Sequence, residues 1–162
     1  MTVYSISADV DFVSPDDDTV IAQLGDLSFL VIPHWVGNAC SLHAEASTGT
    51  PQDALDGFHR EISGLGIRIR RYDLGLMSVS DIATELDVSR ETVRLWSTGS
   101  RRGHFPDRFA HVGSSQVWAW SEVYHWARDN GYELEDRGVP LPLWLLERTN
   151  GKLAGSEMTV AP

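Results

Sequence analysis

The chain has 162 residues, 42% of them hydrophobic, with six tryptophans and a formal charge of −10. This length suits one ordinary domain or two small ones, and the apolar content excludes a disordered chain because enough surface can be buried to offset the chain entropy. The acidic charge excludes a uniformly basic nucleic-acid binder, since such proteins neutralise phosphates with Lys and Arg.

Two further features bear on the class of protein. No apolar run approaches the roughly 18 residues that a membrane span needs, and no secretory signal pattern opens the chain. Cys40 stands alone, which excludes an internal disulfide and a paired-cysteine metal site. We therefore expect a cytoplasmic protein without a membrane partner, in which Cys40 is a small core residue.

The first elements in chain order are a strand, a helix and a hairpin. Residues 4–12 alternate apolar and polar side chains, the pattern of a strand with one solvated face. Ser14, Pro15 and the aspartates 16–18 then favour the start of a short helix that ends at Gly25. Residues 27–36 and 40–46 have strand composition on either side of a Gly-Asn turn, which predicts a hairpin.

A second helix and a final strand follow. Thr50 and Pro51 open a helix whose apolar residues fall on one face before Gly66 ends it. Residues 67–70 alternate Ile and Arg as a strand. The order over residues 1–75 resembles the split βαββαβ pattern of ferredoxin-like domains in topology, and this fold serves many activities, so a sensing, assembly or partner-binding role is a default expectation.

This first part contains no recognisable cofactor motif. His34, His43 and His59 lack the local spacing of metal ligands, and each fits the surface of a strand or helix. The three aspartates before residue 19 lack the later ligands of a calcium loop. We expect neither a metal nor another cofactor.

Two short helices are predicted next. Ser78 and Asp81 have the spacing of a capping box, and the apolar residues from Val79 to Leu86 form one face of a helix. Ser89 caps a second helix, in which Val93 and Trp96 point back at the first. The small or apolar residues Ala83, Val88, Val93 and Trp96 resemble the helix-crossing positions of a helix-turn-helix, with Asp87 at the turn position that requires a left-handed backbone.

A predicted hairpin and closing helix extend this motif. Residues 109–118 form two short strands around a Gly-Ser-Ser tip, and a further helix is expected to start at Ser121. The string SVSDIATELDVSRETVRLWSTGSRRGHFPDRFAHVGSSQVWAWSEVYHWARDNG resembles the small winged helix of MerR-type and phage-excisionase-type DNA-binding proteins. We therefore expect an α+β protein whose ferredoxin-like N-terminal domain is followed by a winged helix-turn-helix over residues 76–131.

The resemblance implies roles for particular side chains. Helix 89–97 would enter the major groove, and the 109–118 wing would follow the DNA backbone. Arg90 and Arg94 have the donor geometry to read guanine or to bind phosphate, and the arginines and serines near the wing would contact phosphates. The candidate DNA-binding residues are Ser89, Arg90, Glu91, Arg94, Arg101, Arg102, Arg108, Ser114 and Ser115.

Residues 132–162 read as a C-terminal extension. A polar connection to Pro142 precedes a short apolar helix of one or two turns over residues 143–148. Trp144 in this helix would dock onto either domain or onto a second subunit, so a homodimer or a protein partner through this region or the N-terminal domain stays open.

These observations favour a non-enzymatic, sequence-specific protein that binds double-stranded DNA, either a transcriptional regulator or a phage-type recombination or repression factor. The charge distribution is compatible with this reading, because residues 1–77 carry −7 and residues 78–131 only −1. The alternative is an acidic interaction module with a degenerate winged helix, such as a toxin-antitoxin or anti-repressor component. No phosphate loop, nucleophile elbow or paired-cysteine site supports an enzyme.

Overall fold

The computed structural model describes residues 1–99, 104–134 and 136–160. These residues form six helices and eight strands, which confirms the expected α+β class. The chain divides into two compact units: the first comprises residues 1–73 and 138–162, and the second comprises residues 74–137. Residues 138–162 are thus part of the first unit, whereas the sequence indicated an extension over residues 132–162 and left open what it packs against.

The first unit is built on an antiparallel sheet with the strand order β2-β3-β1-β4. Its strands are β1 (Thr2–Val10), β2 (Leu30–Val36), β3 (Ala39–Thr48) and β4 (Ile69–Tyr72). Burial alternates along β3, where Leu42 and its even-numbered neighbours are buried while His43 and Glu45 are exposed. One face of the sheet therefore carries the core, and the other face is open to solvent.

Two helices follow the first and third strands. Helix α1 (Asp18–Gly25) is capped by the Asp17 carboxylate, which accepts from the Val20 N–H at 3.2 Å. Helix α2 (Pro51–Gly64) is capped by Thr50 and buries Leu55, Phe58 and Ile62. The 3.6-residue periodicity that predicted α2 is the same periodicity that gives it a continuous apolar face toward the core.

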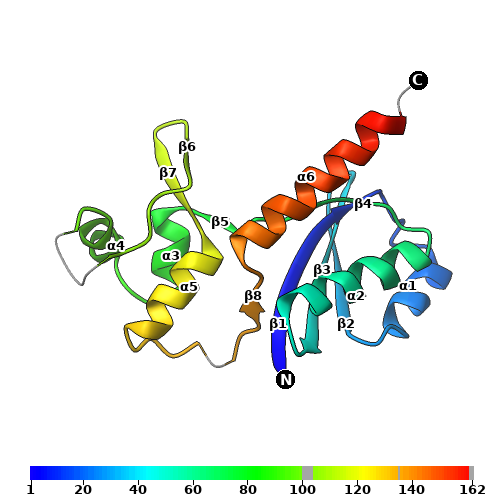
Figure 1. The fold of residues 1–162 in the computed structure, drawn as a ribbon, viewed down its shortest axis with the longest axis horizontal. Helices are drawn as coiled ribbons and strands as arrows, with labels where there is room; N and C mark the ends of the chain where they lie inside the picture. Colours follow the sequence, from blue (N-terminus) through cyan, green and yellow to red (C-terminus); the bar gives the residue numbers. More distant parts are fainter. Residues whose placement is uncertain (100–103, 135, 161–162) are drawn as a thin grey trace. The chain divides into compact units, whose positions relative to one another are not determined.

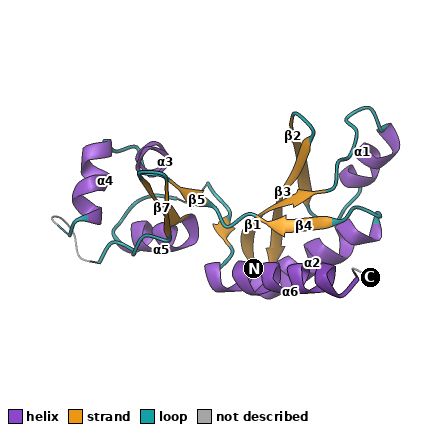
Figure 2. Cartoon of the chain, turned by 90° about the horizontal axis from the view of Figure 1, so that it is seen from above, coloured by secondary structure: helices purple, strands orange, loops and turns teal. Residues whose placement is uncertain are grey.

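The C-terminal segment adds a strand and a helix to this unit. Strand β8 (Val139–Pro140) pairs parallel with β1 at Tyr4 and Ser5. Gly138 makes this approach possible, because a Cβ there would lie 3.0 Å from the backbone nitrogen and the Cβ of Ser5. Helix α6 (Leu143–Val160) lies beside α2 (Figure 2). Arg148 of α6 donates to the Gln52 side chain of α2 at 3.5 Å.

A side-chain amide of α6 is hydrogen bonded to the backbone of β4. The Asn150 Oδ1 accepts from the Tyr72 N–H at 2.7 Å, and its Nδ2 donates to the Tyr72 carbonyl at 2.9 Å. The side chain thus pairs with an edge strand as a neighbouring strand would. This helix has 18 residues, far more than the one or two turns predicted.

The second unit contains three helices around a three-stranded sheet of order β5-β7-β6. In Figure 1 the β6–β7 hairpin extends away from α3 and α5, and α4 lies beside α3. The elements are β5 (Leu76–Met77), α3 (Val79–Glu85), α4 (Arg90–Ser97), β6 (Ala110–Val112), β7 (Ser115–Ala119) and α5 (Trp120–Asp129).

Helix α5 begins earlier than predicted. Ala119 occupies the N-cap position without a side-chain hydrogen bond, and Ser121 is buried at 4% exposure inside the first turn. The expectation that Ser121 starts the helix is therefore wrong, because the preceding strand β7 runs directly into it and fixes its first turn.

Over the part of the chain that the structure describes, none of the helices combines the length and apolar character needed to span a bilayer.

Candidate nucleic-acid interface

Helix α3 begins at a capping box. The Ser78 hydroxyl accepts from the Asp81 N–H at 3.2 Å, while the Asp81 carboxylate accepts from the Ser78 N–H at 2.9 Å and from its hydroxyl at 2.8 Å. The hydrogen bonds that the Asp81 carboxylate accepts hold its pKa below the ordinary value, and the bond from the Ser78 backbone N–H has the largest effect. The sequence predicted this box from the spacing of the two residues.

The turn between α3 and α4 has a left-handed residue. Asp87 has φ of +52°, a conformation that Asp tolerates better than most residues that carry a Cβ. The Val88 N–H donates to the Ala83 carbonyl at 3.0 Å, and Ala83 itself is buried. A small residue on α3 and a left-handed turn therefore bring α3 and α4 together as the sequence predicted.

Helix α4 separates an apolar face from a charged one. Ser89 caps it, accepting from the Thr92 N–H at 3.1 Å. Val93 and Trp96 are buried at 0% and 3% exposure. Arg90, Glu91 and Arg94 are exposed, and the Arg94 guanidinium lies 3.8 Å from the Glu91 carboxylate. The helix thus presents two arginines, four residues apart, on its solvent side.

The hairpin that follows is held by a tight turn. Val112 pairs with Ser115, so Gly113 and Ser114 form a two-residue loop. Gly113 has φ of +60°, whereas the φ of Ser114 is not positive. This combination is that of a type II′ turn, whose first central residue is usually glycine. Val112 is 65% exposed at this tip, and both serines are exposed. The hairpin therefore projects small polar groups and one apolar side chain into solvent.

An aromatic cluster holds these parts to one core. The Trp96 ring of α4 lies 4.8 Å from that of Trp126 on α5 and 5.9 Å from that of Phe105, measured between centroids. Phe105 also contacts Trp118 on β7 at 5.8 Å, and Trp118 donates from Nε1 to the Pro106 carbonyl at 3.1 Å. Helix α4, the hairpin and helix α5 are therefore coupled through these rings, and the buried rings of Trp96, Trp118 and Trp126 are unavailable for stacking on nucleic-acid bases.

The predicted site residues lie on α4, on the hairpin and in the segment between them. Arg90, Glu91 and Arg94 share the solvent side of α4, and the exposed residues Arg108, Ser114 and Ser115 lie on the hairpin or directly before it. Ser89 is also exposed, but its hydroxyl oxygen accepts from the Thr92 N–H in the helix cap and is hydrogen bonded to the Thr92 hydroxyl at 2.8 Å. The predicted contacts of Arg101 and Arg102 lie outside the described residues. His111 is exposed on β6 and was not among the predicted site residues; only its place in the hairpin could have indicated it.

Two of the three histidines of residues 1–73 have ordinary structural partners. His43 Nδ1 is hydrogen bonded to the Ser7 hydroxyl at 2.8 Å, and His59 Nδ1 to the Tyr72 hydroxyl at 3.0 Å. Within residues 1–99, 104–134 and 136–160, no three His, Cys, Asp or Glu side chains form a group that could hold a metal ion.

A group of arginines in the first unit was not predicted from the sequence as a site. The side chains of Arg68, Arg70 and Arg71 line one cavity of about 580 Å³. The signal in the sequence was the Arg-Arg pair, which breaks the strict alternation of residues 67–70.

Comparison of the chain with models of protein families, with curated proteins and with solved structures gives no match.

Proposed function

We propose that residues 74–137 bind double-stranded DNA as a winged helix-turn-helix, with α4 in the major groove and the β6–β7 hairpin on the backbone. The observation that carries this proposal is the arrangement of α4. Arg90 and Arg94 are exposed one turn apart on this helix, whereas Val93 and Trp96 are buried and fix the orientation of the helix. An α-helix fits the major groove, and arginine can donate two hydrogen bonds to guanine.

The order of the elements supports the architecture that we propose for both units. A left-handed turn joins α3 to α4, and a hairpin and closing helix follow, the sequence of parts typical of a winged helix. In the first unit, the order β1-α1-β2-β3-α2-β4 and the antiparallel sheet β2-β3-β1-β4 favour a ferredoxin-like domain. On this reading β8 and α6 are additions to that domain.

The acidic charge of the chain limits where DNA can approach. Residues 74–137 contain ten acidic residues and seven arginines, whereas residues 1–73 contain eleven acidic residues and four arginines. The first unit therefore repels phosphates over a distance of about 8 Å at physiological salt. We expect weak binding to random DNA and a correspondingly larger share of the affinity from base contacts made by α4.

The test uses the full chain and duplexes selected from a random library. Fluorescence anisotropy measures affinity for a selected duplex and for its scrambled counterpart over a range of salt concentrations. The variants are Arg90→Gln and Arg94→Gln, and the matched control is Arg128→Gln, which removes the same charge from the exposed end of α5 in the same unit. Circular dichroism verifies that each variant is folded.

We expect each α4 variant to weaken binding to the selected duplex by about 1–3 kcal/mol and binding to the scrambled duplex much less. The Arg128→Gln control leaves both affinities nearly unchanged. If Arg90 and Arg94 contact phosphates alone, the losses are equal on both duplexes and the salt slope falls by about one per contact. Unchanged binding by both folded variants would show that α4 is not the interface.

The acidic charge also supports a second candidate function. With a net charge of −10, the chain is suited to a basic protein partner, so an interaction module remains the alternative. Selection from the random library distinguishes the two functions. Failure to enrich any sequence, together with the absence of salt-dependent binding to any duplex, would favour the interaction module.

A further inference from the structure

Strand β4 contains a bulge that groups its arginines. Asp9 of β1 pairs with Arg71, but the next residue, Val10, pairs with Ile69, so Arg70 is the extra residue in β4. Without the bulge, strict alternation would place Arg71 on the face opposite Arg70. Two consecutive residues at a bulge can share a face, and both arginines are exposed here.

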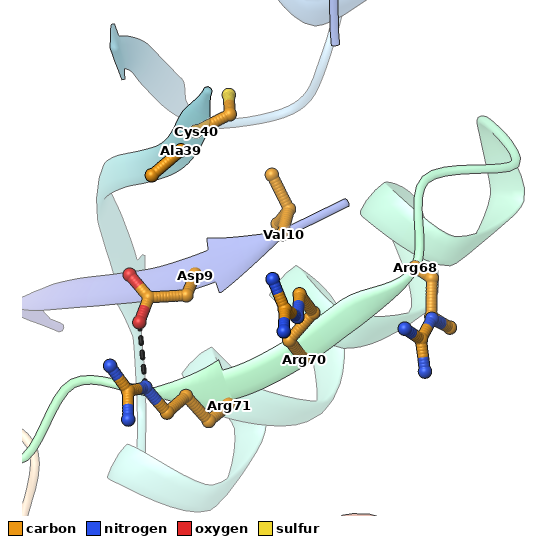
Figure 3. Close-up of a pocket in the computed structure, with 7 residues that line it drawn as sticks. All are labelled: Asp9, Val10, Ala39, Cys40, Arg68, Arg70 and Arg71. Atoms are coloured by element: carbon orange, nitrogen blue, oxygen red, sulfur yellow. Dashed lines mark hydrogen bonds and ion pairs between the residues drawn. The ribbon is translucent and has the colours of Figure 1, made fainter. Parts of the chain in front are cut away.

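The cavity lies where β1 ends between β3 and β4. Val10 and Cys40, which pair across β1 and β3, form its apolar part together with Ala39. Asp9 and three arginines form its polar part, and Figure 3 shows the Arg70 side chain extending from β4 toward Val10. Burial raises the pKa of the Cys40 thiol, so this group is neutral at pH 7 and adds no negative charge to the cavity.

Two of the three arginines are held by carboxylates. Arg71 Nε lies 2.7 Å from the Asp9 carboxylate, and Arg68 binds Asp11 through Nε at 2.9 Å and Nη2 at 3.0 Å. These pairs orient the two guanidinium groups and neutralise their charge. Among the described residues, no hydrogen bond or ion pair engages the Arg70 guanidinium.

The charge of the cavity differs from that of its surroundings. Residues 1–73 contain four arginines and no lysine against eleven acidic residues, yet three of the four arginines line this one cavity. Asp11 also interacts with Arg70 through space, so the three arginines exceed the two carboxylates Asp9 and Asp11 by one charge. An unpaired guanidinium has five donors in a planar fork, which matches two oxygens of a carboxylate or phosphate.

We propose that this cavity binds a small anion through carboxylate or phosphate oxygens, with Arg70 as the principal donor and Val10, Ala39 and Cys40 as the apolar wall. Arg68 and Arg71 act as positioning residues, since their carboxylate partners fix them on either side of Arg70. The site lies wholly within the first unit, so it does not depend on whether the second unit binds DNA.

The experiment titrates the full chain with three compounds by isothermal calorimetry at low ionic strength. Inorganic phosphate and butanoate present the two kinds of oxyanion, and butanamide is the neutral counterpart of butanoate. The variant is Arg70→Gln, and Arg60→Gln is the matched control, because Arg60 is the fourth arginine of residues 1–73 and is exposed on α2, outside the cavity. Circular dichroism verifies that both variants are folded.

We expect saturable binding of at least one anion with a stoichiometry of one, and no binding of butanamide. Arg70→Gln weakens this binding roughly tenfold or more, because a charge-assisted hydrogen-bond pair is lost, and Arg60→Gln leaves it unchanged. Tighter binding of butanoate than of phosphate assigns the site to apolar carboxylates, and the reverse order assigns it to phosphates. No saturable binding of either anion, or equal weakening by both variants, would overturn the proposal.

Discussion

Replacement of Asn150 by Ala is expected to destabilise the first unit, although the residue lies 78 positions from its partner in the sequence. Asn150 makes two hydrogen bonds to the backbone of Tyr72, at 2.7 and 2.9 Å, and Tyr72 is 1% exposed. Each bond contributes about 1 kcal/mol net, so their loss costs about 2 kcal/mol. The higher helix propensity of Ala offsets about 0.5 kcal/mol of this.

The expected decrease in the free energy of unfolding is therefore about 1.5 kcal/mol, and more if water cannot reach the two unpaired backbone groups. Amide hydrogen exchange at Ile6 and Ala8 measures this quantity for the first unit separately, because both residues are buried in β1. Gly151→Ala is the control on the next residue of α6. A Cβ added at Gly151 would have no neighbour within 4 Å. Amide exchange in Gly151→Ala is therefore expected to be as slow as in the wild type or slower.

Slower or unchanged exchange at Ile6 and Ala8 in Asn150→Ala would refute this reasoning. It would mean that α6 is not coupled to the sheet through the Tyr72 backbone. A decrease of the same size in Gly151→Ala would also count against it, since it would indicate that any substitution on α6 loosens the unit.

Two further predictions concern the second unit. Trp96→Ala removes a ring that has three other aromatic rings within 6 Å, so it is expected to cost about 3–5 kcal/mol and to unfold this unit. Near-ultraviolet circular dichroism measures the loss, and retention of the wild-type spectrum would contradict the prediction. Because the folded pKa of Asp81 is lowered, its stabilising effect is present above its unfolded pKa of about 3.9 and is lost as the pH falls through the lowered folded value. The free energies of unfolding of wild type and Asp81→Asn, measured in urea, should therefore differ at neutral pH and become equal in acid. A difference in free energy that grows as the pH falls would contradict the prediction.

The sequence determined most of the local structure. The alternation near residues 4–12 and 40–46 gave strands, and the 3.6-residue period after Pro51 gave a helix, because both patterns follow from which face each element buries. The capping box at Ser78 and the left-handed turn at Asp87 were also identified from residue type and spacing. These features depend on neighbours within a few residues, so a single sequence contains enough information to predict them.

Element boundaries were less well determined. The first strand ends at Val10 rather than at residue 12, and α5 starts one residue before Ser121. The first shift arises where the register with β4 changes at the bulge, and the second arises where β7 continues directly into α5. Both depend on pairing with a distant strand, which a local pattern does not reveal.

The long-range associations were decided by the tertiary structure alone. Leu141, Leu145 and Leu146 are buried in the first unit, but an apolar segment of this kind could pack equally well on either domain or on another subunit. The bulge that places Arg70 beside Arg71 is visible only once β4 is paired with β1. Hydrophobic burial is not directional, so an apolar sequence shows that a segment is buried but does not show which surface buries it. Asn150 and Gly138 supply specific contacts that join the C-terminal segment to the first sheet.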